Sequence, residues 1–345
     1  MPVSDGRRAS LAGSRTGPDP TAPQRPTVRR TTRAAGFVVA LGAAAGTWLV
    51  WWAMVTTWPG QRLEERVFDT ADRFQDVVNP LVEPVLLLGS LPWLLTGLGL
   101  VCGIGLLRRR WRAAAMAAVV IIGSNVTTQV VKDGVFDRTG LVGEWNRDIN
   151  TLPSGHVTVV VAAWAALLLV TPRGWRPLAA FAGAVASGAI GLATLGDRWH
   201  RPSDVVAAVL VVVAWTALVC AVAPARWADR PGDDPAARAA VSTRLVTTSL
   251  WVLAVPTAGL SVLAAAATEG HTWTGLPWAG GLTAYTAGLL AACAISATAF
   301  AVLLPLCQAT ARPWPSGRRE PVPGPDGRAS LPMSVPRHRV PTEPP

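Results

Sequence analysis

Residues suited to phosphate chemistry gather between positions 132 and 204 of this chain. Lys132, the only lysine, ends an apolar stretch, and Arg138 lies six residues further on. Beyond them come the tetrad Pro153-Ser154-Gly155-His156 and the run His200-Arg201-Pro202-Ser203-Asp204. Cations and helix-start amides can hold a phosphate, and a histidine backed by a carboxylate can attack it. The set predicts a site that binds a phosphate and attacks it.

The tetrad stands where a polar loop becomes an apolar run. Proline suits the first turn of a helix, because its missing N–H costs nothing there. The free N–H groups that follow lie at the positive end of the helix dipole, where anions bind. Gly155 allows close approach of the anion, Ser154 can donate its hydroxyl, and His156 can protonate a leaving oxygen. Taken alone, the tetrad is also explained as a helix cap.

The step from His200 to Asp204 is the second local signal. Pro202 begins another apolar run, so Asp204 falls in the first turn of a helix. From there its carboxylate can accept a hydrogen bond from one ring nitrogen of His200 and leave the other nitrogen nucleophilic. An interfacial histidine beside a helix-capping aspartate is the alternative for this pair alone.

Lys132 and Arg138 supply the fixed positive charge that a dianionic phosphate needs, and arginine adds a bidentate fork. Either cation alone is also explained as an interfacial side chain that reaches toward water. No cluster of histidine, cysteine and carboxylate has metal-ligand spacing, so the predicted site uses no metal and no cofactor. The four cysteines lie within or beside apolar runs and predict no disulfide framework.

The composition predicts a membrane protein. Half of the residues are hydrophobic, 15% are charged, and the mean hydropathy is +0.35. A helix needs about 20 apolar residues to cross the hydrocarbon, and only helices or closed barrels satisfy the backbone there. We expect an all-α, polytopic membrane helix bundle from eight apolar runs: 34–58, 84–107, 113–131, 154–171, 178–196, 203–223, 245–267 and 281–306.

The basic residues predict the orientation of the bundle. With both tails inside, the cytoplasmic segments hold 23 basic residues and the external ones 8, which is the positive-inside pattern. Lys132, His156 and His200 then share the outer side. The net charge of +10 is spread over cytoplasmic segments and so predicts no nucleic-acid partner. The expected partners are membrane lipids and a lipid phosphate substrate in a cell membrane.

Segment 61–79 is expected to differ from the spans. Its apolar residues fall near helical spacing among acidic ones, which predicts a short amphipathic helix on the outer surface. Such a helix would be either a connector that rests on the surface or a gate over the path by which a lipid enters.

Taken together, these residues resemble the motifs of the type 2 phosphatidic acid phosphatase superfamily, whose members are related to the vanadium haloperoxidases. Three motifs carry the resemblance, in the family's order: Lys132 to Arg138, the tetrad at 153–156, and His200 to Asp204. The resemblance covers about 34–223 and implies a six-helix phosphatase core without metal. It implies a phospho-histidine on His200, oriented by Asp204, with His156 protonating the leaving group. Lys132, Arg138, Ser154 and Gly155 are then expected to hold the phosphate.

Two motifs depart from the family's pattern. Its first motif has six residues between lysine and arginine and ends in Arg-Pro, whereas five intervene here and Thr139 follows. Its third motif has Ser-Arg six to seven residues before the histidine, where this chain has Ala193 and Thr194. Arg198 and Arg201, which flank His200, are candidate substitutes for the missing arginine.

The expected domain organisation has five parts. They are a disordered cytoplasmic tail (1–33), a six-span phosphatase-like membrane domain (34–223), a cytoplasmic linker (224–244), two additional transmembrane helices (245–306) and a second disordered cytoplasmic tail (307–345). The expected function is hydrolysis of a lipid phosphate or pyrophosphate at the extracytoplasmic face. Two alternatives stay open: a phosphotransferase with an acceptor other than water, and a weakened protein that binds or transports lipid phosphates.

Overall fold

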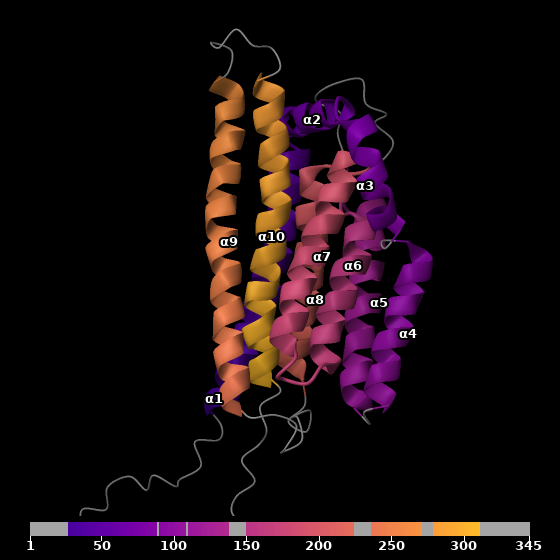
Figure 1. The fold of residues 1–345 in the computed structure, drawn as a ribbon, viewed down its shortest axis with the longest axis vertical. Helices are drawn as coiled ribbons and strands as arrows, with labels where there is room; N and C mark the ends of the chain where they lie inside the picture. Colours follow the sequence, from indigo (N-terminus) through magenta and orange to yellow (C-terminus); the bar gives the residue numbers. More distant parts are fainter. Residues whose placement is uncertain are drawn as a thin grey trace, which may run out of the picture.

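A computed structural model describes residues 27–87, 90–107, 110–137, 150–223, 236–270 and 279–310. In these ranges the regular structure is helical throughout. Figure 1 shows long helices standing side by side, with the short helix α2 across their upper end. The all-α membrane bundle predicted from the apolar runs is confirmed.

The chain builds the bundle in sequence order. Its first half comprises α1 (Thr27–Val50), a π-helical turn η1 (Trp51–Val55), α2 (Trp58–Asp72), α3 (Gln75–Leu87) and α4 (Leu91–Leu107). The second half comprises α5 (Trp111–Gly134), α6 (Gly155–Val170), α7 (Arg176–Gly196), α8 (Pro202–Val222), α9 (Ala236–Gly270) and α10 (Ala279–Thr310).

Within the described ranges, six helical segments are long and apolar enough to cross a membrane: Arg30–Val55, Trp111–Gly134, Arg176–Gly196, Pro202–Val222, Ala240–Thr268 and Ala279–Thr310. Two further apolar helices, Leu95–Leu107 and Gly155–Val170, are shorter. At 1.5 Å per residue the 16 residues of α6 reach only about 24 Å. The second half of the tetrad, Gly155 and His156, begins this short helix.

The predicted run 84–107 is not one continuous helix. Its first residues complete α3, which ends at Leu87, and α4 begins at Leu91. The interruption falls just before Pro92, whose missing N–H and ring fit the first turn of a helix and not its interior. Apolar length alone therefore overestimated this span.

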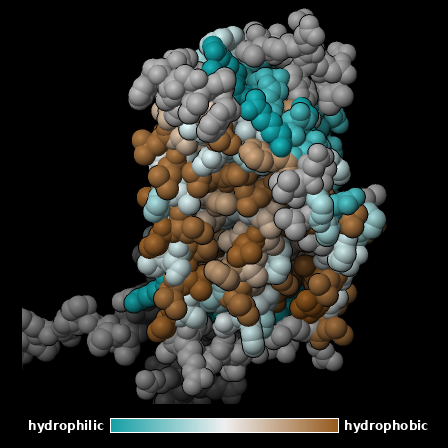
Figure 2. Space-filling model, turned by 45° about the horizontal axis from the view of Figure 1, so that its top comes forward, coloured by the Kyte–Doolittle hydropathy of each residue, from teal (hydrophilic) through white to brown (hydrophobic). Residues whose placement is uncertain are grey.

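The core lies among α6, α7, α8 and α10. Along α6, 11 of the 16 residues are buried, and Phe300 of α10 is fully buried. A Cβ on Gly183 of α7 would lie 2.5 Å from the Phe300 ring, so the missing side chain lets α7 and α10 approach. The outer helices instead turn large apolar side chains outward, and Figure 2 shows the hydrophobic flank below a hydrophilic end.

The amphipathic helix predicted for segment 61–79 is present only in part. Residues 61–72 belong to α2, and the chain turns at Arg73 and Phe74 before 75–79 begin α3. Thr57 caps the first turn of α2 and Pro59 follows, as in other helix starts. The Gln61 amide donates to the carbonyl of Val55 (2.6 Å), and the Arg66 guanidinium donates to the carbonyl of Thr268 (3.1 Å). These bonds attach α2 to η1 and to the end of α9, directly over the segment that leads into α8.

Candidate active site

The turn between α7 and α8 presents His200. The carbonyl of Thr194 accepts the N–H groups of both Trp199 and His200, at 3.1 Å each. Arg198, inside this turn, has a φ of 59°. A non-glycine residue in the left-handed region costs roughly 1–3 kcal/mol and persists only where its surroundings hold it. The chain therefore accepts local strain to bring His200 close to the start of α8.

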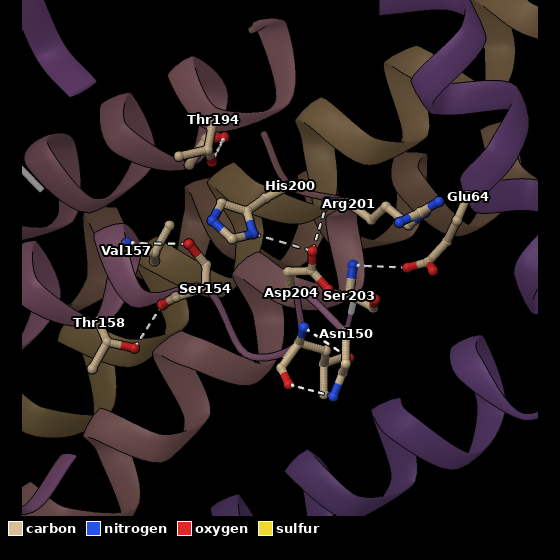
Figure 3. A network of polar contacts seen from close by, with 12 residues as sticks. Glu64, Asn150, Ser154, Val157, Thr158, Thr194, His200, Arg201, Ser203 and Asp204 are labelled. Atoms are coloured by element: carbon tan, nitrogen blue, oxygen red, sulfur yellow. Dashed lines mark hydrogen bonds and ion pairs between the residues drawn. The ribbon is translucent and has the colours of Figure 1, made fainter. Parts of the chain in front are cut away.

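Asp204 orients the His200 ring. One carboxylate oxygen, Oδ2, lies 3.2 Å from His200 Nδ1 and accepts the N–H of Arg201 at 3.0 Å. His200 is 8% exposed and Asp204 is fully buried, so little water competes for these bonds. With Nδ1 held in this way, Nε2 lies on the other side of the ring, away from Asp204 (Figure 3). The predicted hydrogen bond across four residues is confirmed.

The start of α6 joins the start of α8. The Ser154 N–H donates to the backbone carbonyl of Asp204 (3.0 Å), and the Ser154 Oγ accepts the N–H of Val157 (3.3 Å). Ser154 is thus the N-cap of α6, which is the alternative explanation that the sequence offered for the tetrad. It is fully buried beside Asp204. A Cβ on Gly155 would meet Gln129 Nε2 at an ordinary 3.5 Å, so packing alone does not require a glycine there.

His156 lies on the first turn of α6, facing His200. The two ring centroids are 6.1 Å apart, and the Trp199 ring meets that of His156 edge-on at 4.9 Å. The two rings are therefore close enough for one small group lying beside them to contact both.

Lys132, in the last turn of α5, is a further predicted residue brought to this place. It is half-buried, and its charge interacts with those of Asp204 and His156. Asn150 ties this end of α5 to the chain entering α6. Its amide donates to the carbonyls of Lys132 (3.0 Å) and Phe136 (2.6 Å), and its Oδ1 accepts the N–H of Leu152 (3.1 Å). Sequence reasoning missed Asn150, which no motif marks.

A comparison with protein families found a match for part of the chain. Residues 113–228 match the family model described as the PAP2 superfamily, a range that holds all three motifs. This part of the chain is therefore similar to the PAP2 superfamily. The comparisons with curated proteins and with solved structures found no match. Members of that superfamily are phosphatases that act on phosphate esters. The described part of this chain has several helices apolar enough for a multi-pass membrane protein.

Two parts of the predicted PAP2 site are not tested by the structure. Arg138 lies outside the described residues. Among those that are described, no group of three or more histidine, cysteine and acidic side chains could hold a metal ion.

The candidate substitutes for the PAP2 arginine are both engaged by α2. Arg198 forms an ion pair with Asp72, and its guanidinium carbon lies 4.3 Å from the centre of the Phe68 ring. The Arg201 guanidinium lies 3.7 Å from a Glu65 oxygen and 5.3 Å from the same ring. In Figure 3 the Arg201 side chain extends away from the His200 ring. Thr194, in the arginine's expected place, is buried and donates its hydroxyl to Gly191.

A third carboxylate of α2 contacts the start of α8 from outside the matched range. Glu64 Oε1 accepts the N–H of Ser203 at 3.1 Å, and Glu64 is 2% exposed. The sequence signal for this contact was only the acidic pattern of 61–79, which is equally typical of a solvent-facing helix surface. Its partner, 139 residues away along the chain, could not be identified from that pattern.

Proposed function

We propose that the chain is an integral membrane phosphatase that hydrolyses a lipid phosphate or pyrophosphate through a phospho-histidine. The observation that carries the proposal is the buried His200–Asp204 pair facing His156 at the start of α6. The first two residues form a nucleophile with its orienting carboxylate, and the third is an acid placed across the space that a phosphate fills.

The reaction follows from this placement in two steps. His200 Nε2 attacks phosphorus while the bond to the leaving oxygen breaks, and His156 gives that oxygen its proton. Asp204 stabilises the imidazolium that carries the phosphoryl group. Water, deprotonated by His156, then attacks phosphorus, releases inorganic phosphate and restores His200.

Charge stabilisation comes from the same helix ends. Lys132 and the free N–H groups at the start of α6 neutralise the equatorial oxygens, which is most of what phosphoryl transfer requires. We assign Arg138 to the same role. Helix α2, which contacts the start of α8, lies across the upper end of the bundle (Figure 1). Figure 2 shows hydrophilic residues at the upper end, where the headgroup of a lipid phosphate would lie.

Purified protein with a panel of radiolabelled lipid phosphates and pyrophosphates tests the proposal. We expect release of free phosphate that survives excess EDTA and is inhibited by vanadate, which adopts the five-coordinate phosphoryl geometry. Label transferred to an acceptor would identify the phosphotransferase instead. Loss of activity with EDTA, restored by one divalent ion, would contradict the metal-free site.

One observation favours the weakened-protein alternative. Thr194 replaces the PAP2 arginine, and both neighbouring arginines are engaged by α2. Tight binding of lipid phosphate by wild-type protein, without turnover of any member of the panel, would establish that alternative.

We further propose that the site faces the extracytoplasmic side of a cell membrane. In Figure 1, α1 begins and α10 ends at the lower end of the bundle, opposite α2. This arrangement supports two tails on one side, and the excess of basic residues in the adjoining segments makes that side cytoplasmic.

Single cysteines in a cysteine-free background test this orientation. Gly134 and Trp175 are both exposed. Gly134 is at the end of α5 that is near the site, and Trp175 precedes α7 at the helix end that is far from the site. We expect Gly134→Cys to react with an impermeant thiol reagent in intact cells, and Trp175→Cys to react only after permeabilisation. The reverse pattern would place the site in the cytoplasm.

A further inference from the structure

We propose that Glu64 of α2 is a positioning residue for the nucleophile, acting through the first turn of α8. It lies outside the range that matches the PAP2 superfamily, so this chain brings it to the site with a separate helix. The inference rests on the proposed phosphatase function for its kinetic consequences.

The contact occurs at the point where α8 begins. Ser203 is the second residue of α8, and its N–H is one of the donors that a helix start leaves without a partner inside the helix. Glu64 Oε1 accepts it at 3.1 Å, and the two residues are 2% and 3% exposed. A carboxylate is favoured at this positive end of the helix dipole. Glu64 thus accepts the hydrogen bond of one backbone N–H at the start of α8. The N–H groups at the start of α6 are left to bind the phosphate.

The same turn of α8 holds the catalytic pair. Pro202 precedes Ser203 in the sequence, and Asp204 follows it. Asp204 Oδ2 lies within hydrogen-bond distance of His200 Nδ1 and accepts the N–H of Arg201. Any tilt of this first turn moves Asp204, and with it the His200 ring. Displacement of a reacting group by about 1 Å can reduce a rate about 100-fold.

Helix α2 is a firm platform for this contact because it is attached independently of Glu64. Gln61 and Arg66 bond to Val55 and Thr268, as described above. On the α10 side, a Cβ on Gly288 would lie 2.9 Å from Pro202 Cγ and 3.3 Å from Val67 Cγ1. Three helices therefore meet at Gly288, and loss of the Glu64 carboxylate leaves α2 in place.

Two replacements of similar volume separate the hydrogen bond from the packing. Glu64→Gln keeps an oxygen acceptor for the Ser203 N–H, whereas Glu64→Met fills the space without one. We expect kcat of Glu64→Met to fall about 10- to 100-fold with KM within about threefold of wild type, because binding and chemistry depend on different groups. Glu64→Gln should retain a kcat within about threefold of wild type.

Amide hydrogen exchange of the peptide around 200–206 provides a readout that does not depend on turnover. We expect faster exchange in Glu64→Met and wild-type exchange in Glu64→Gln, at equal melting temperatures in detergent. Asp69→Met, an exposed acidic position on the same helix, is the matched control and should match wild type in both measurements.

Three results would overturn the inference. They are wild-type kcat and exchange in Glu64→Met, equal losses in the Met and Gln variants, and a loss confined to KM. If wild-type protein hydrolyses no phosphate ester, the proposed function fails, and the exchange comparison still decides whether Glu64 holds the first turn of α8.

Discussion

Replacing His200 with alanine is expected to abolish turnover of a lipid phosphate and of an activated aryl phosphate alike. The covalent step needs the ring nitrogen opposite the one that Asp204 holds, whatever the leaving group. Loss of a nucleophile from such a unit costs at least about 10⁴-fold in kcat. Steady-state assays on both substrates, with acid-labile phospho-enzyme measured after rapid quenching, check this expectation.

His156→Ala is the contrasting variant for the same experiment. It should be impaired on the lipid phosphate, whose alkoxide needs a proton, and should retain part of its activity on the aryl phosphate, whose leaving group does not. It should also form the phospho-enzyme that His200→Ala lacks. A phospho-enzyme trapped in His200→Ala protein would show that the roles of the two histidines are wrongly assigned.

The parts of the site that sequence reasoning found are those made by short stretches of chain. His200 and Asp204 are four residues apart across a helix start, so a hydrogen bond between them follows from local geometry. The Ser154 cap lies within one turn of α6, and proline marks its beginning. The helices themselves could be predicted because a membrane leaves the backbone few other ways to satisfy its hydrogen bonds.

The parts that were not found depend on contacts between distant segments. Glu64 meets Ser203, and Asp72 meets Arg198, across more than 120 residues. No local pattern distinguishes these carboxylates from the solvent-facing side of an amphipathic helix. The same holds for the two arginines, which their proximity to His200 suggested as phosphate ligands and which the structure places against α2. Partner choice among several charges is a property of the assembled fold.

The break within 84–107 has a different cause. Hydropathy averages over a window, and the window there is uniformly apolar, with no charge to divide it. Helix α4 begins at Leu91 with Pro92 in its first turn, a backbone preference that the hydropathy scale does not measure.

Asp204→Asn is expected to reduce kcat by about 10²- to 10⁴-fold on both substrates while the protein stays folded. The asparagine carbonyl can replace Oδ2 as acceptor for the N–H of Arg201, so the turn before α8 keeps its shape. What is lost is the negative charge beside His200, which stabilises the imidazolium formed when Nε2 takes the phosphoryl group. The variant should therefore form its phospho-enzyme slowly in rapid-quench experiments, at wild-type melting temperature in detergent.

Asp133→Asn is the matched control for this charge. Asp133 is exposed, follows Lys132 at the end of α5 and interacts with the charge of that lysine. If general electrostatics near the phosphate governed the rate, both variants would change kcat by similar factors. We expect only the buried carboxylate to matter, because its charge acts on the His200 ring over one hydrogen bond without intervening water. Wild-type phospho-enzyme formation in Asp204→Asn would show that His200 needs no orienting charge, and the nucleophile would have to be sought elsewhere in the site.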